Sequence, residues 1–377
     1  MTTTMASPQR EERAATRRHD GLRRLPFLVP GGVALVAGLD AALMLIGLPA
    51  PVSADRLPDV HGMLLVLGFV GTLIALERAV ALGRPAGFLA PGLLGAGAVL
   101  LLSPAPLVVG RGALLAGTVA LTALYVPLWR RQRDDAVLIQ GLGAVLAVGA
   151  ATLWLGSVQV PALLPWLVGF IVLTIAGERL ELARIAMGPG AGHRLVVLSA
   201  AVLVTVTASL LWPAAGAPAL GLVLLLLVGW LAAHDVARRT VRTGGLVRFM
   251  AASMLAGYFW LAVAAAVWLV GGPATEGVRY DALVHAVFLG FTISMIMAHA
   301  PVILPAVLRL PMTYHPALLV PAAALHASLA LRLWVGDALG VRLAWQVGGA
   351  LNIASLLGFV GVVVWVLSRS ARPGAPR

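Results

Sequence analysis

Two histidines in this sequence have the spacing expected of ligands to one iron or copper ion. His61 stands seven residues before a Gly-Phe pair at Gly68, and His285 stands five residues before a second Gly-Phe pair at Gly290. If the two pairs occupy equivalent places on two helices, the imidazoles differ in depth by only about 3 Å. Two imidazoles at one level suit bis-imidazole ligation of haem iron, or half of a copper site. The alternative is that each is an interfacial histidine bonded to a carbonyl or to water.

Small residues accompany these two histidines along their segments. Gly62, Gly68 and Gly71 follow the first, and Ala286 and Gly290 follow the second. Such residues leave room for a flat macrocycle between two helices. The alternative is close helix packing, which also uses small residues.

Three further ionisable residues fall inside apolar segments, where they are costly and often functional. His299 lies about 21 Å deeper than His285, so we expect it to bind metal separately or to pair with His315 near the inner face. His326 lies nearer mid-depth and could face the outer site as a further metal ligand. Asp40 falls in the middle of the first segment without an adjacent base. It could carry protons, accept a bond from a buried donor, or remain neutral. A structural role is the alternative for the histidines.

Two Glu-Arg pairs stand near the inner ends of their segments. Glu77–Arg78 and Glu178–Arg179 are adjacent in the sequence, which predicts two interfacial ion pairs. The sequence has no phosphate-binding loop, zinc-protease pair or serine nucleophile elbow.

The composition determines which kind of scaffold must position these residues. Of 377 residues, 60% are hydrophobic and only 11% are charged, and the mean hydropathy is +0.97. A soluble domain carries about 25% charged residues, so a soluble globular enzyme and a disordered chain are both excluded. Long apolar runs cross a bilayer as helices, because helices satisfy their own backbone hydrogen bonds. We therefore predict an all-α, polytopic membrane bundle surrounded by lipid.

Twelve apolar windows of spanning length follow one another along the chain. They lie near residues 28–48, 61–82, 87–103, 106–128, 136–156, 160–177, 195–213, 217–233, 247–271, 282–308, 317–333 and 342–368. The remainder is a basic arm over 1–27, a tail over 369–377 and short loops. No soluble domain of normal size fits there.

The basic residues predict the orientation of the bundle. The formal net charge is +12, and all 27 basic residues are arginine. With the N-terminus inside, 22 arginines lie on the inner side and five on the outer side, as the positive-inside rule expects. Both termini are therefore expected in the cytoplasm, and no nucleic-acid partner is needed to explain the charge. The absence of cysteine excludes disulfides and thiolate metal sites.

An internal pattern recurs three times, each time four segments further on. The three segments read GFVGTLIALER from Gly68, GFIVLTIAGER from Gly169 and GFTISMIMAHA from Gly290. The tenth position of each is polar, namely Glu77, Glu178 and His299. The pattern predicts three four-helix units, near 28–128, 136–233 and 247–368, in a pseudo-threefold arrangement. Chance agreement between Leu/Ala-rich segments is the alternative.

The segments around the two outer histidines resemble a known family. HGMLLVLGFVGTLIA from His61 and HAVFLGFTISMIMAHAP from His285 are similar to the corresponding helices of the NnrS family. Those are twelve-span bacterial membrane proteins that bind haem and copper and are linked to nitric oxide metabolism and stress. This chain departs from them at Gly62 and Met63, where the family usually has a further His and Glu.

The topology also resembles the catalytic subunit of haem-copper oxidases and nitric oxide reductases. That fold has twelve helices in three arcs, with low-spin haem held by histidines of helices two and ten, which His61 and His285 match. The resemblance implies that Arg332 and Arg342 face haem propionates. It does not extend to the oxidase copper site, because the sixth segment has Glu178 but no histidine.

Together these observations lead us to expect a haem-binding protein of the bacterial inner membrane, with copper as a second metal. The expected role is nitric oxide or related redox stress metabolism, or electron transfer, with a gaseous ligand and an electron-donor protein as partners. Whether it turns over a substrate stays open. One alternative is a proton-coupled transporter without cofactor, using Asp40, His299 and His326. The other is a factor that delivers haem or copper to a reductase.

Overall fold

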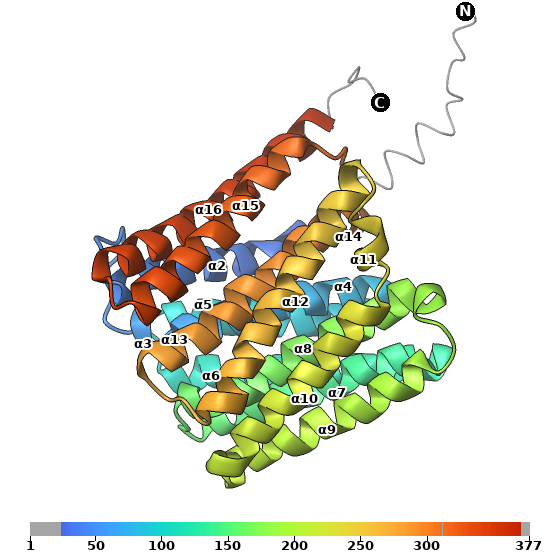
Figure 1. Ribbon diagram of the computed structural model, residues 1–377, viewed down its shortest axis with the longest axis horizontal. Helices are drawn as coiled ribbons and strands as arrows, with labels where there is room; N and C mark the ends of the chain where they lie inside the picture. The colour runs from blue at the N-terminus through green and yellow to red at the C-terminus, as the bar shows by residue number, and fades with distance from the viewer. Residues whose placement is uncertain (1–23, 311, 371–377) are drawn as a thin grey trace, which may run out of the picture.

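The computed structural model describes residues 24–310 and 312–370, and within them every regular element is a helix (Figure 1). Twelve helices are long and apolar enough to cross a membrane. The expected all-α bundle is confirmed, and the chain is a multi-pass membrane protein. Most of the arm at 1–27 and of the tail at 369–377 lies outside the described residues.

Several of the spanning helices consist of more than one element. The twelve spans, in chain order, are α2 (Leu25–Leu45), α3 with η1 and α4 (Leu57–Leu82), η2 with α5 (Pro85–Leu102), α6 (Leu107–Gln132), α7 (Asp135–Leu155), α8 (Val160–Met187), α9 (Ala191–Leu211), α10 (Pro213–His234), α12 (Gly245–Gly271), α13 with η3 and α14 (Gly277–Leu308), η4 with α15 and η5 (Pro316–Ala338) and α16 (Arg342–Ser370). A short helix, α11 (Ala237–Thr240), lies between α10 and α12. The predicted separation of the windows near 87–103 and 106–128 is confirmed, because α5 ends at Leu102 and α6 begins at Leu107.

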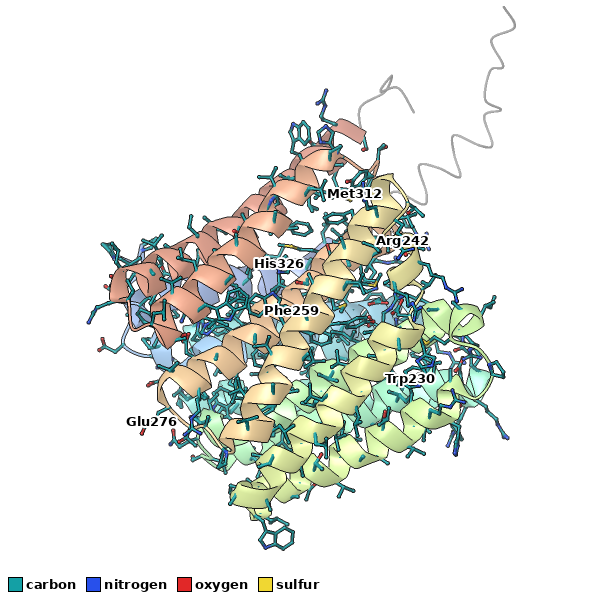
Figure 2. All side chains as sticks on the ribbon, in the orientation of Figure 1. Trp230, Arg242, Phe259, Glu276, Met312 and His326 are labelled. Carbon is teal, nitrogen blue, oxygen red and sulfur yellow. The ribbon has the colours of Figure 1, made fainter. Side chains whose placement is uncertain are left out.

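The two ends of the bundle differ in charge. The arginine-rich end carries the loops between α4 and α5, α6 and α7, α8 and α9, and α10 and α12. Figure 2 shows Arg242 and Met312 toward this end, Glu276 at the opposite end, and Phe259 and His326 between them. That the arginine-rich end faces the cytoplasm stays a prediction.

The three Gly-Phe glycines all lie where helices cross closely. A Cβ added at any of them would stand within 3.0 Å of a side-chain atom on a neighbouring helix. The partners are Ala98 for Gly68, Leu146 for Gly169 and Trp260 for Gly290. Close helix packing therefore explains these glycines, as the alternative expectation held. The pseudo-threefold arrangement of whole units stays a prediction.

Two of the three repeat segments share a further backbone feature. The π-helical segments η1 (Leu64–Gly71) and η3 (Ala286–Ile293) are each eight residues long, and each begins four residues before its Gly-Phe glycine. The residue directly after each π-helical segment donates a hydrogen bond from its hydroxyl to the carbonyl of that glycine. The distances are 2.6 Å from Thr72 to Gly68 and 2.5 Å from Ser294 to Gly290. In contrast, α8 is an uninterrupted α-helix. The second and tenth spans are thus more alike than either is to the sixth.

Candidate functional site

His61 projects from α3 at the end of the bundle opposite the arginines. Its Nδ1 lies 2.8 Å from the carbonyl oxygen of Gly38 on α2. A carbonyl can only accept, so Nδ1 carries the proton and Nε2 keeps its lone pair. Within the described residues Nε2 has no hydrogen-bond partner. His61 therefore presents the nitrogen that a metal would need.

His285 ends α13 and is held in the same way. Its Nδ1 lies 2.9 Å from the carbonyl oxygen of Asp281 and 3.3 Å from the Oδ1 of the same residue. Arg332 fixes the Asp281 carboxylate with two bonds, Nε to Oδ2 at 2.9 Å and Nη2 to Oδ1 at 2.7 Å. The result is a guanidinium–carboxylate–imidazole chain that orients the ring. Such outer partners hold metal-binding histidines and raise their basicity.

These two histidines lie at the same end of the bundle. His61 is close enough to interact electrostatically with both His285 and Arg332. Figure 1 shows α3 and α13, which carry the histidines, at the same end of the bundle. Two free Nε2 atoms there could supply two ligands to one ion. Across residues 24–310 and 312–370, no group of three or more His, Cys, Asp and Glu side chains is arranged to hold a metal.

The two arginines expected near a haem differ in their surroundings. Arg332 is buried, bonded to Asp281 and stacked over the ring of Trp345 at 5.1 Å. Arg342 lines a pocket of about 450 Å³ at this end, together with Asp337 and Trp345. Arg342 is therefore the one placed at an open space, whereas Arg332 organises His285.

His299 is engaged through both ring nitrogens at the other end of the bundle. Its Nδ1 lies 2.7 Å from the Met295 carbonyl oxygen, and its Nε2 lies 3.3 Å from Arg179 Nη1. His315 is instead bonded through Nδ1 to the backbone N–H of Ala317. The expected pairing of His299 with His315 is therefore not seen among the described residues.

His326 has an indole as its partner. Trp260 Nε1 donates to His326 Nδ1 at 3.0 Å. An indole can only donate, so the proton of the neutral imidazole lies on Nε2. This tautomer suits a structural hydrogen bond, and not ligation through Nε2.

Asp40 closes a turn near the end of α2, and the expectation of a mid-span position is wrong. Its Oδ1 accepts a bond from the Val52 N–H at 3.2 Å, while its Oδ2 is buried without a partner in the described residues. The helix ends at Leu45, three residues earlier than predicted, so Asp40 lies five residues from its end.

One of the two expected Glu-Arg pairs forms, and the other does not. Arg78 pairs with Glu77 as predicted, and it also bonds to Glu181 at 3.2 Å. Arg179 pairs with Asp235 through two bonds of 2.7 and 3.0 Å. The prediction of a pair between Glu178 and Arg179 is wrong, because Arg179 bonds to the buried Asp235 carboxylate, which follows the end of α10.

Asp235 lies between α10 and α11 and is fully enclosed. Besides Arg179, it accepts bonds from the Tyr258 hydroxyl at 2.7 Å and the Ala237 N–H at 2.9 Å. Burial alone would raise the pKa of Asp235, but these donors and the arginine charge outweigh it and hold that pKa below its ordinary value.

Sequence reasoning missed Asp281 and Asp235. Asp281 stands four residues before His285, the spacing at which side chains of a helix meet, so that signal was present. Asp235 follows the apolar run of α10 and reads as a loop residue, so no sequence signal identified its partner.

A family comparison covers the whole bundle. Residues 24–368 match the family model described as "Domain of unknown function (DUF8744)". The chain belongs to the DUF8744 family. Its matched region spans nearly all of the twelve helices and includes His61 and His285. No curated protein and no solved structure is significantly similar to the chain.

Proposed function

We propose that this DUF8744 protein is an integral membrane haem protein in which His61 and His285 would hold the haem iron. One observation carries the proposal: each imidazole is anchored through Nδ1 and leaves Nε2 free, on two helices at the same end of the bundle. Two imidazole nitrogens are the number that a low-spin haem iron takes from protein.

The donor set fits a haem better than it fits a bare metal ion. The porphyrin brings four nitrogens of its own, so the chain needs to add only two. Anchored Nδ1 atoms fix the tautomer and the ring orientation in advance. Arg342, which lines a pocket at the same end of the bundle, would be the residue to bind a propionate, and Arg332 acts through Asp281 on His285.

The site favours electron transfer within the wider role in nitric oxide or related redox stress. A bound haem would supply one-electron chemistry, and the chain contributes ligation, a low-dielectric surrounding and tuning of the potential. A haem held by both His61 and His285 would supply electron transfer and not gas binding. The link to nitric oxide is supported by the NnrS-like segments alone. Copper is proposed only as an alternative occupant of the His61–His285 pair, because His299 and His326 are committed to other bonds.

The arginine bias supports placing this bundle in a bacterial inner membrane with both termini in the cytoplasm. The haem would then lie toward the outer side, where an electron-donor protein could reach it. A delivery factor for haem or copper would share the same ligands, but it would bind them labilely and show no redox turnover.

The experiment is a visible spectrum of purified protein, oxidised and dithionite-reduced, with iron and copper analysis of the same sample. We expect a sharp reduced alpha band and stoichiometric iron. His61→Ala and His285→Ala should each abolish the low-spin spectrum or convert it to another spin state.

The matched control is His193→Ala, since His193 is exposed at the arginine-rich end. Its spectrum should equal that of the wild type. A colourless, metal-free protein after haem-supplemented expression would overturn the proposal and favour a transporter. An unchanged spectrum in both ligand variants would show that haem binds elsewhere.

A further inference from the structure

A cavity of about 310 Å³ lies between α2, α4, α8, α14 and α16, in the half of the bundle nearer the arginine-rich end. Its walls are almost entirely apolar, with Leu, Ile, Val, Phe and Met side chains. Glu77, Glu178 and His299, the tenth-position residues of the three repeated segments, all line it. The polar tenth positions of the three repeated segments therefore line the same cavity.

Glu178 is the polar lining residue whose side chain has no bond. The Thr174 and Thr292 hydroxyls donate to carbonyls of their own helices, and His299 uses both nitrogens. Glu77 is held by Arg78. In the part of the chain that the structure describes, no hydrogen bond or salt bridge reaches the Glu178 carboxylate. A carboxylate accepts hydrogen bonds and attracts cations, so the cavity offers a negative anchor.

Both arginines near Glu178 are bonded to other carboxylates. Arg179 pairs with Asp235, and Arg78 pairs with Glu77 and Glu181. Arg24, at the rim, donates to the backbone carbonyl of Val307. A positively charged ligand would give the Glu178 carboxylate a partner, whereas an anion would be repelled by it.

The cavity reaches the outer surface of the bundle between α2 and α16. Gly32 on α2 and Val360 and Val364 on α16 line it and are exposed. In a membrane these residues face lipid, so a ligand with an apolar body can enter sideways from the bilayer. A small inorganic cation would leave the apolar walls without a partner.

We propose that this cavity binds a lipophilic organic cation, with its positive centre against Glu178 and its apolar body along α2 and α16. The size and apolar walls select a hydrophobic body, and the unpaired carboxylate selects the charge. The site is separate from the His61–His285 pair, and its occupancy does not depend on haem.

The test uses full-length protein in nanodiscs of phosphatidylcholine and equilibrium dialysis with tetraphenylphosphonium. Tetraphenylborate, which has the same shape and the opposite charge, is the matched probe, and protein-free nanodiscs give the background. We expect protein-specific binding of the cation, and binding of the anion at least about tenfold weaker. Glu178→Gln keeps the shape of the side chain, removes the charge and should weaken cation binding by about tenfold or more.

Two more variants separate the cavity from the bulk surface. Gly32→Phe should also abolish binding, because a side chain at Gly32 meets nothing within 4 Å and would occupy the lateral opening. Glu276→Gln, at an exposed carboxylate of the opposite end (Figure 2), should bind like wild type. Equal binding of both probes, undiminished binding by Glu178→Gln, or no binding by protein of native helix content and size would each overturn the proposal. The last outcome would leave Glu178 as a site for a proton only.

Discussion

The histidine pair at one end of this bundle differs in its bonding from His299, which lies toward the other end. At the end opposite the arginine-rich loops, His61 and His285 each bond to a backbone carbonyl through Nδ1 and keep Nε2 free. Toward the arginine-rich end, His299 bonds through both ring nitrogens, to the Met295 carbonyl and to Arg179. The residue type is the same, but only the first arrangement can accept a ligand. Ionisable residues inside a membrane are therefore informative only once their partners are known.

The carboxylates show the reverse distribution. At the histidine pair, the Asp281 carboxylate is bonded to Arg332, so it does not stand unpaired beside the free imidazoles. Near the arginine-rich end, Asp235 takes Arg179 away from the neighbouring Glu178 and leaves that carboxylate unpaired in the cavity. One end thus offers lone pairs to a metal, and the other offers a charge to a cation.

The largest effect that we predict from this difference between the ends is on the visible spectrum of the haem protein. His285→Ala should remove the low-spin haem signal completely, because it deletes one axial ligand. His299→Ala should leave the band position and the iron content unchanged, although it removes a buried side chain. Spectra of the two variants, recorded with iron analysis at equal protein concentration, test this directly. If His299→Ala also lost the haem while remaining folded, the contrast between the ends would be wrong.

The next effect concerns stability at the arginine-rich end. Asp235→Asn should destabilise the protein by about 3–5 kcal/mol, because it leaves the Arg179 charge buried without its partner. Since folding lowers the pKa of Asp235 below 3.8, its contribution is fully present above that pH and is lost only as the pH falls further.

Unfolding titrations in sodium dodecyl sulfate at pH 8 and pH 5 should therefore give the same difference between Asp235→Asn and wild type. Glu276→Gln, which changes an exposed carboxylate, should have little effect at either pH. A difference that disappeared by pH 5 would show that Asp235 takes up a proton above pH 5, so that its pKa is raised and not lowered, and that the buried pair is weaker than its geometry implies.

A smaller effect sharpens the role of the outer partners. Asp281→Asn keeps the shape of the side chain but removes the charge that links Arg332 to His285. Haem retention, measured as the dissociation constant by titration into apoprotein, should weaken about ten- to hundredfold. Asp59→Asn alters an exposed acidic residue two positions from His61 and should leave the affinity unchanged. Equal affinities for Asp281→Asn and wild type would reduce Asp281 to a purely structural role.

The architecture could be predicted from the sequence because the hydropathy of a spanning helix is a property of about 20 consecutive residues and not of single side chains. The twelve apolar windows correspond to twelve spanning helices among the described residues, and the separation of the windows near 87–103 and 106–128 was also predicted correctly. The π-helical segments were not predicted, since no residue pattern in the sequence indicates the wider turns of a π-helix. Their identical register in the second and tenth spans nevertheless agrees with the Gly-Phe alignment made from sequence.

Individual partners were much harder to predict than segments. The Gly38 carbonyl that anchors His61 is a backbone atom of another helix, and no side-chain pattern points to it. Arg179 was assigned to its sequence neighbour Glu178, whereas the fold brings in Asp235 from the far end of α10. Adjacent residues on a helix point in different directions, so sequence neighbours are poor candidates for buried ion pairs.

The smallest effect concerns the crossing beneath His285. Gly290→Ala should cost about 1–3 kcal/mol, because the added Cβ would stand 2.4 Å from Trp260 Cβ and Cγ and would force the two helices apart. Since Trp260 also donates to His326, the strain would spread along α12 to α15. Gly229→Ala is the matched control on α10, where a Cβ meets nothing within 4 Å, and it should stabilise by about 0.5–1 kcal/mol through helix propensity. Equal free energies of unfolding for the two variants would mean that α12 can shift at little cost. Gly290 would then not fix the distance between the helix of His285 and α12.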